Sequence, residues 1–154
     1  MTRQDADATD RVRDLLEEVA DALDLDADVV VEERDGEIHG RLEGDDLGLF
    51  IGRHGQTIDA VQHLAQRILA AAAGEQRRVV IDAEGYRARR RETLERQADE
   101  AADEAVRAGE PVALDAMTAA ERRLVHEYLR DREDVETHSE GEEPERRLVV
   151  APAA

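Results

Sequence analysis

The sequence predicts an α+β fold made of two small domains that pack against each other. Apolar residues recur with helical spacing in several segments, and short β-branched runs lie between these segments. With 154 residues, the chain is long enough for two domains of about 70 residues, a size near the lower limit of independent stability. We expect a disordered segment over residues 1–8, a first domain over 9–83 and a second over 84–152, with no long linker between them.

A helix followed by a β-hairpin is expected to open the first domain. Thr9 or Asp10 is the expected N-cap of this helix, since apolar residues recur after it at intervals of three and four. A β-branched run at 29–31 then begins a strand, and Asp35-Gly36 suits the positive φ angles of a tight hairpin turn. The apolar residues of these elements are Val12, Leu15, Leu16, Val19 and Leu23 in the helix, and Ile38 and Leu42 in the returning strand.

Two helices and a strand are expected to complete the first domain. Asp45-Asp46 are the expected caps of a short helix over residues 47–51, which stops at Gly52. A long amphipathic helix follows Gly55 and is expected to end at Gly74, and residues 77–83 are predicted to form a third strand. The order becomes helix, strand, strand, helix, helix, strand.

The second domain is expected to contain two helices and three short strands. A helix is predicted over residues 86–108, where Gly109-Glu110-Pro111 stops it. Thr118 and Glu121 have the spacing of a capping box, which begins a second helix that runs to about Arg132. The predicted strands cover residues 111–114, 135–139 and 147–151.

Composition and charge narrow the functional classes. The chain has no cysteine, no signal-like amino terminus and no apolar run near the ~18 residues that span a bilayer, so we expect a cytoplasmic protein without stable membrane insertion. The formal net charge is -18, which is the wrong sign for bulk attraction of nucleic acid. All 21 basic residues are arginines, however, and many stand in short clusters that are suited to local phosphate contacts. The absence of lysine is consistent with either a GC-rich genome or a high-salt cytoplasm.

A Gly-x-x-Gly motif over residues 52–55 separates the two helices of the first domain. A motif this short recurs by chance, and the alternative is a glycine turn that binds nothing. Its position adds specificity, because two glycines let another backbone approach without Cβ atoms in the way. The amides of Gln56, Thr57 and Ile58 are expected to face outward at a helix N-terminus, which favours anionic oxygen. This arrangement predicts a clamp for a phosphate backbone.

The element order and the segment 51–58 together resemble the bacterial-type (type II) KH domain, whose GXXG loop grips about four nucleotides of single-stranded RNA or DNA. The resemblance implies that Arg53 and His54 point to phosphates or solvent, and that Ile51 and Ile58 line the adjacent groove. The implied RNA-binding residues are Ile51, Gly52, Arg53, His54, Gly55, Gln56, Thr57 and Ile58.

The second half resembles an R3H domain, which is named for an Arg and a His separated by three residues. Arg122 and His126 have this spacing and share a helix face, opposite to an apolar side centred on Leu124, Val125 and Tyr128. The alternative is a solvated basic face that binds nothing. The first helix of this half changes from basic to apolar along one face, and its Tyr86 is expected either to stack on a base or to pack at the helix start. The implied nucleic-acid-binding residues are Tyr86, Arg87, Arg90, Arg91, Arg122, Arg123 and His126.

Longer segments carry a more specific resemblance, to the KH-R3H proteins known as Jag or KhpB and also called SpoIIIJ-associated protein. These segments are 82–91, 121–126 and 137–147, and the similarity covers Thr9 to Pro152. It implies a regulator that binds single-stranded RNA, acts with a small single-KH partner and is linked to cell elongation or sporulation. Many members carry an additional amino-terminal Jag domain, which we expect this chain to lack.

Catalysis, metals and cofactors are not expected. The five histidines form no metal-ligand spacing and the sequence has no phosphate-binding P-loop. Two alternatives to an RNA-binding regulator stay open. One is a protein-protein adaptor, which the charge of -18 favours. The other is a single-stranded DNA binder.

Overall fold

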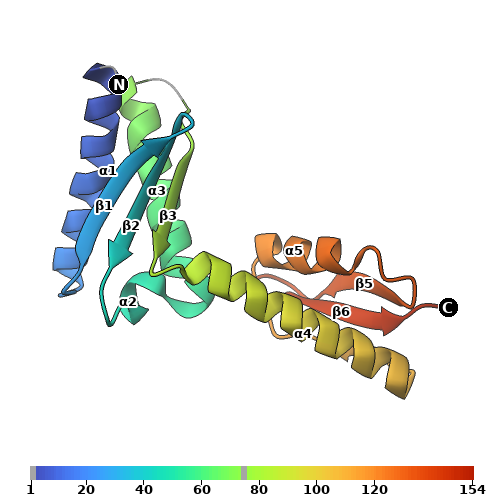
Figure 1. Ribbon diagram of the computed structural model, residues 1–154. Helices are drawn as coiled ribbons and strands as arrows, with labels where there is room; N and C mark the ends of the chain where they lie inside the picture. The colour runs from blue at the N-terminus through green and yellow to red at the C-terminus, as the bar shows by residue number, and fades with distance from the viewer. Residues whose placement is uncertain (1–2, 74–75) are drawn as a thin grey trace. The chain divides into compact units, whose positions relative to one another are not determined.

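The computed structural model describes residues 3–73 and 76–154 and divides into two compact units, Met1–Arg87 and Ala88–Ala154. The division falls just inside a long helix, α4 (Tyr86–Ala108), which is labelled in Figure 1. Both units combine helices with a three-stranded sheet, so the predicted α+β class is confirmed. Each unit is described below on its own.

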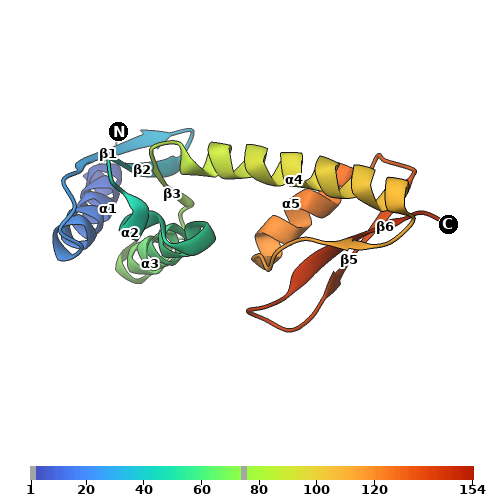
Figure 2. The ribbon, with the colours of Figure 1, turned by 90° about the horizontal axis from the view of Figure 1, so that it is seen from below.

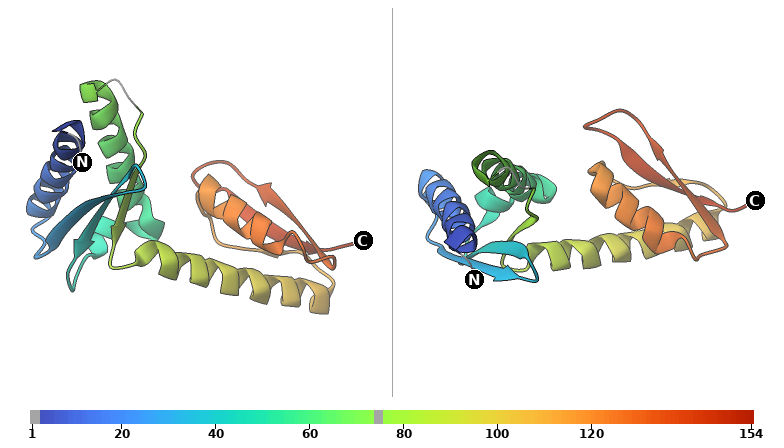
Figure 3. Two further views of the ribbon diagram at one scale, coloured as in Figure 1. Left: turned by 45° about the horizontal axis from the view of Figure 1, so that its top comes forward. Right: turned by 90° about the horizontal axis from the view of Figure 1, so that it is seen from above.

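Unit 1 has the predicted order helix, strand, strand, helix, helix, strand. Its sheet has the order β1-β2-β3, in which β2 pairs antiparallel with β1 and parallel with β3. The helices α1 and α3 lie side by side on one face of this sheet (Figures 1 and 3). The elements are α1 (Arg3–Ala22), β1 (Asp28–Arg34), β2 (Glu37–Glu43), α2 (Gly48–Ile51), the 3-10 turn η1 (Arg53–Gly55), α3 (Gln56–Ala73) and β3 (Val79–Ala83).

The core of unit 1 lies between the two long helices and the sheet. Leu16 of α1, Ile38 of β2 and Ile81 of β3 are fully buried there. The predicted apolar stripes of α1 and α3 supply most of the remaining contacts, as expected for helices that bury one face. The turn at Asp35-Gly36 has the positive φ angles that the sequence predicted, 52° and 78°.

The start of α1 differs from the prediction. Residues 1–8 were expected to be disordered, with an N-cap at Thr9 or Asp10, but the helix begins at Arg3. Ala8 is already buried, with 8% of its surface exposed, so the contact between α1 and the core extends further back than the branched residues indicate. The Thr9 hydroxyl donates to Ala6 O inside the helix, so Thr9 does not cap it.

The predicted start of α2 and the predicted end of α3 can also be compared with the structure. Asp45-Asp46 do not cap α2, because the residue before its first turn is Leu47 and no side chain bonds to the helix start. Gly74, the predicted end of the long helix, lies outside the described residues.

Unit 2 packs two helices with a sheet of order β4-β6-β5, in which all neighbouring strands are antiparallel. Figure 2 labels its two helices and the strands β5 and β6. Leu94 and Ala98 of α4 meet Val125 and Leu129 of α5 in its core. The buried side chains of α4 are Leu94 and four alanines, Ala98, Ala101, Ala102 and Ala105. The remaining elements are β4 (Val112–Ala113), α5 (Ala119–Leu129), β5 (Val135–Glu140) and β6 (Arg147–Pro152).

The capping box of α5 is confirmed. The Thr118 hydroxyl accepts from Glu121 N, and the Glu121 carboxylate accepts from Thr118 N. The helix ends at Leu129, three residues before the predicted end at Arg132. From Arg130 onward the amides bond to carbonyls three residues back instead of four, so the last turn tightens and the helix stops.

Candidate nucleic-acid interface

The loop at residues 52–55 joins α2 to α3 in a conformation that requires glycine at both ends. Gly52 has φ 72°, and a Cβ there would overlap the Thr57 hydroxyl and lie 2.8 Å from Thr57 N. Gly55 has φ 78°, and a Cβ there would lie 2.7 Å from Cε1 of Tyr86. The two glycines therefore serve close packing inside unit 1.

Tyr86 packs between the 52–55 loop and the core of unit 1. Its ring packs against Gly55 and against the core of unit 1. Of the two roles considered for Tyr86, stacking on a base or packing at the helix start, these contacts favour packing. The sequence grouped Tyr86 with the second domain, but the residue belongs to unit 1.

The two central residues of the loop differ in exposure. Arg53 is exposed and His54 is half-buried. His54 has φ 56° and ψ 28°, a left-handed conformation that His adopts more readily than most residues. The loop also uses its own amides, because Gly55 N donates to Gly52 O and Gln56 N donates to Arg53 O. The expectation that the Gln56 amide faces outward is therefore wrong.

The flanking residues divide into surface and core. Gln56 is exposed, and Ile51 and Thr57 are half-buried. Ile58 is 0% exposed and packs in the core of unit 1, so the expectation that it lines a groove is wrong. Its burial anchors the first turn of α3 beneath the loop.

Arg87 is bound within unit 1 and does not belong to a surface of the second domain. Its guanidinium donates to Ile81 O of β3 at 2.7 Å, and to Asp59 and Gln62 of α3 at 2.9 and 3.0 Å. Its backbone amide donates to Asp82. The guanidinium thus has protein partners on three sides, which argues against the prediction that Arg87 binds nucleic acid.

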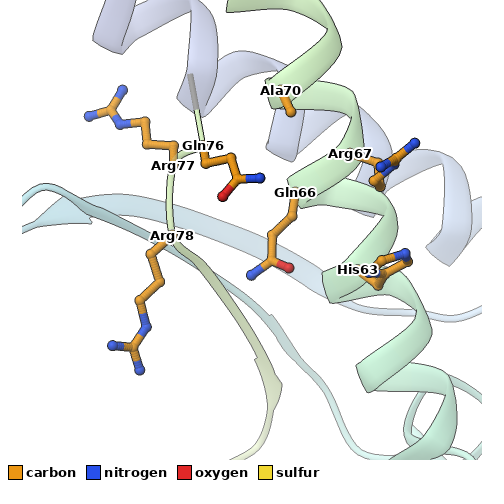
Figure 4. Close-up of a pocket in the computed structure, with 7 residues that line it drawn as sticks. All are labelled: His63, Gln66, Arg67, Ala70, Gln76, Arg77 and Arg78. Carbon is orange, nitrogen blue, oxygen red and sulfur yellow. The ribbon is translucent and has the colours of Figure 1, made fainter. Parts of the chain in front are cut away.

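A cavity of about 400 Å³ lies further along α3, between this helix and the segment that leads to β3 (Figure 4). Gln66 and Gln76 extend into this space from its two sides. Arg67 is exposed and has no ion pair among the described residues, whereas Arg77 and Arg78 pair with Glu33 and Glu37. The sequence analysis missed this cavity, although the Arg77-Arg78 cluster was its visible signal. The lining residues are His63, Gln66, Arg67, Ala70, Gln76, Arg77 and Arg78.

Arg122 of unit 2 is buried, with 7% of its surface exposed. It lies on the same side of α5 as Val125 and Leu129, which corrects its predicted place on the solvent face. Its guanidinium donates to Met117 O and to Glu143, both at 2.6 Å. Arg122 therefore holds together the loop before α5 and the connection between β5 and β6.

His126 is exposed, and its Nδ1 contacts the Thr137 hydroxyl of β5. Arg122 and His126 therefore do not form one exposed pair, despite their spacing. Arg90 is also engaged, because it pairs with Glu121 at 2.8 Å and ties α4 to α5. Of the arginines predicted for this half, Arg91 and Arg123 remain largely exposed, with side chains 67% and 79% accessible, and each pairs with a carboxylate of its own helix, Glu95 and Glu127.

Arg91 and Arg123 line one cavity of about 320 Å³ in unit 2, between α4 and α5. The sequence placed Tyr128 on the apolar side of α5, but its ring is exposed at this cavity and its hydroxyl donates to Asp99. That bond raises the pKa of Tyr128. The other lining residues are Ala120, Leu124 and Glu127.

Glu127 lies on the exposed face of α5 beside several basic side chains. A hydrogen bond from Arg123 to Glu127, followed by the charge of Arg123, lowers the pKa of Glu127. Arg130 and His126 act in the same direction.

No helix over residues 3–73 and 76–154 is long and apolar enough to cross a membrane. No cluster of three or more histidine and carboxylate side chains able to hold a metal ion occurs in the same described ranges.

Comparisons with known proteins agree with this architecture. Residues 9–81 match the family described as "KhpA/KhpB, KH domain", and residues 92–152 match the R3H domain family. The relatives below are each called RNA-binding protein KhpB. The chain is 38% identical over 144 residues to that of Clostridium symbiosum, covering 92% of the chain and 65% of the relative. It is 33% identical over 138 residues to that of Bacillus subtilis, covering 88% and 66%.

A third relative, from Lactiplantibacillus plantarum, is 44% identical over 104 residues, which cover 68% of the chain and 32% of that protein. The chain thus spans between about a third and two thirds of the length of these relatives. Both domain types occur in the order that the structure shows, one in each unit. The chain therefore belongs to the Jag/KhpB family, in which a KH domain is followed by an R3H domain.

Proposed function

We propose that this protein is a non-enzymatic regulator that binds single-stranded RNA in the cytoplasm. The observation that carries the proposal is the 52–55 loop, where two glycines with positive φ support an exposed arginine and a half-buried histidine. Relatives that match about nine tenths of the chain are named RNA-binding protein KhpB. The loop holds the sugar-phosphate backbone, as KH domains do with about four nucleotides.

Unit 2 contributes separate contacts in this proposal. Arg91 and Arg123 supply the charge, and Tyr128 supplies an aromatic ring that is suited to stacking on a base. His126 completes the exposed polar face of α5. Arg87, Arg90 and Arg122 take no part in ligand contact, since each is committed to protein partners.

The double variant Arg53→Asp/His54→Asp tests the loop. It replaces a cation and a histidine by two anions, and Asp tolerates the left-handed backbone at residue 54. Binding to single-stranded RNA of about eight nucleotides, twice the length that a KH loop holds, should weaken at least about tenfold by fluorescence anisotropy. The thermal unfolding midpoint should change little, because neither side chain belongs to the core.

A matched control makes the same charge change elsewhere. Arg34→Asp/His138→Asp alters two exposed residues outside both candidate surfaces and should leave RNA affinity within about twofold of the wild type. Equal affinity of the loop variant and this control would remove the loop from the binding mode. Competition with DNA oligonucleotides of the same sequence decides between RNA and single-stranded DNA.

A second candidate function is a protein-protein adaptor, which the net charge of -18 favours. The partner we propose is a small single-KH protein, because the matched KH family is described by both the KhpA and the KhpB names. A role in cell elongation, division or post-transcriptional regulation belongs to the same proposal. Recovery of such a partner after nuclease treatment, without any crosslinked RNA, would favour the adaptor.

A further inference from the structure

The strand β3 forms an edge of the sheet in unit 1, and half of its backbone groups face away from β2. In a parallel pair, the N–H and C=O groups of alternate residues point to the same side. Arg78 O accepts from Ile38 N at 3.0 Å, so residues 78, 80 and 82 face β2. Residues 79, 81 and 83 therefore direct their polar groups outward.

Side chains cover these outward groups in an unbroken series. An open edge would offer its backbone to a further strand or to the polar edge of a base. Here each outward backbone group from Val79 O to Ala83 N already has a side-chain partner. A ligand therefore cannot form hydrogen bonds to the backbone of β3 without displacing these side chains. The four bonds are Gln66 Nε2 to Val79 O at 3.4 Å, Ile81 N to Gln62 Oε1 at 2.9 Å, Arg87 Nε to Ile81 O at 2.7 Å, and Ala83 N to Asp82 Oδ1 at 2.8 Å.

The amide of Gln62 is held in one orientation. Its Oε1 accepts from Ile81 N and also from the Arg87 guanidinium at 3.0 Å. Both of these groups only donate, so the oxygen must face them and Nε2 must face the other way. Arg87 is itself fixed by Asp59 at 2.9 Å. The orientation is thus set by a network that spans α3, β3 and the first turn of α4.

The Nε2 group of Gln62 is available to a ligand. It has no hydrogen-bond partner among the described residues, and it is not a buried orphan, so it reaches the surface. Gln62 stands seven residues after Gly55, about 10 Å along the axis of α3. Gln66, one turn further, lines the cavity of Figure 4. A strand held at the loop would therefore have its bases within reach of Gln62.

We propose that Gln62 is a specificity-determining residue of this surface, which reads bases by donating from Nε2 and favours uracil over adenine. The inference rests on the proposed RNA-binding function. Uracil presents two carbonyl acceptors, which flank its N3–H donor, whereas adenine presents a single ring acceptor beside an amino donor on its pairing edge. A residue that offers only donors is better matched to uracil.

The variant Gln62→Glu isolates this contact. A carboxylate oxygen still accepts from Ile81 N and Arg87, so the cover on β3 is kept, but the outward donors become an acceptor. We expect the ratio of oligo(U) to oligo(A) affinity in the full chain to fall about tenfold relative to the wild type. Gln97→Glu makes the same charge change on α4 in unit 2 and should leave the ratio unchanged.

The outcomes separate this inference from the function on which it rests. If the wild type binds RNA and Gln62→Glu has the same ratio of oligo(U) to oligo(A) affinity, the role of Gln62 is overturned. The proposed function then still stands. A wild type without preference for oligo(U) overturns the role of Gln62 as well. Failure of the wild type to bind either oligonucleotide overturns both proposals.

Discussion

At the scale of single residues, the burial of Arg122 separates a structural arginine from a binding one. Its guanidinium satisfies Met117 O and pairs with Glu143, and its removal would leave a carbonyl without its donor. We expect Arg122→Met to lower the free energy of unfolding by about 3 kcal/mol, the usual cost of breaking a buried charged contact. Urea denaturation followed by circular dichroism measures this change.

The neighbouring arginine supplies the control for that measurement. Arg123→Met removes an exposed side chain whose partner is Glu127 on the same helix, and should cost about 0.5 kcal/mol or less. RNA affinity should show the opposite order, with the larger loss at Arg123. Equal stability of the two variants would contradict the structural role of Arg122.

At the scale of elements, the turn between β1 and β2 and the loop between α2 and α3 each contain a glycine with the same φ. Comparing alanine variants of the two glycines distinguishes the cost of backbone strain from the cost of packing. Gly36 and Gly55 both have φ 78°, but a Cβ at Gly36 meets nothing within 4 Å, whereas a Cβ at Gly55 meets the ring of Tyr86. Gly36→Ala should cost about 1 kcal/mol, the strain of a left-handed alanine. Gly55→Ala should cost at least about 2 kcal/mol, because overpacking is added to the same strain.

Thermal or urea unfolding of the two glycine variants side by side provides the test. Equal costs would show that the ring of Tyr86 yields to the new methyl group. In that case the loop would depend on Tyr86 less tightly than the contact indicates.

The sequence predicted well those features that depend on residues close together in the chain. The capping box at Thr118 and Glu121 and the turn at Asp35-Gly36 depend on residues within four positions of each other, and both are confirmed. The burial of Arg122 depends instead on Met117 O and on Glu143, which lies 21 residues away. Helical periodicity gives only the direction in which a side chain leaves the helix axis. It therefore did not reveal these partners, which lie on other segments.

The same limit explains why the cover on β3 was missed. Gln62 and Gln66 bond to β3 because α3 packs against this strand, and β3 has a free edge only because it is an outer strand of the sheet. Sheet order is a property of the tertiary fold. By contrast, the glycines of the 52–55 loop were visible directly, because their spacing and position between two helices are features of the chain itself.

At the scale of the whole molecule, the charge distribution limits how the proposed RNA ligand can be held. Residues 1–50 contain 17 acidic residues and 5 arginines, whereas residues 51–85, which include the loop, contain four of each. Many arginines outside the acidic segment are also paired with carboxylates, such as Arg87 with Asp59 and Arg90 with Glu121. Attraction over long distances is therefore weak, and binding must depend on a few direct contacts.

This distribution predicts a shallow salt dependence of RNA binding. If Arg53, Arg91 and Arg123 make the phosphate contacts, about three charges are neutralised, and each contributes about -0.7 to the slope of log K against log salt for single strands. We expect a slope of about -2 from anisotropy titrations at a series of salt concentrations. A slope steeper than about -4 would require many more phosphate contacts than these surfaces offer. Arg53→Asp/His54→Asp should reduce the slope by about one contact, which ties the loop to a phosphate independently of its effect on affinity.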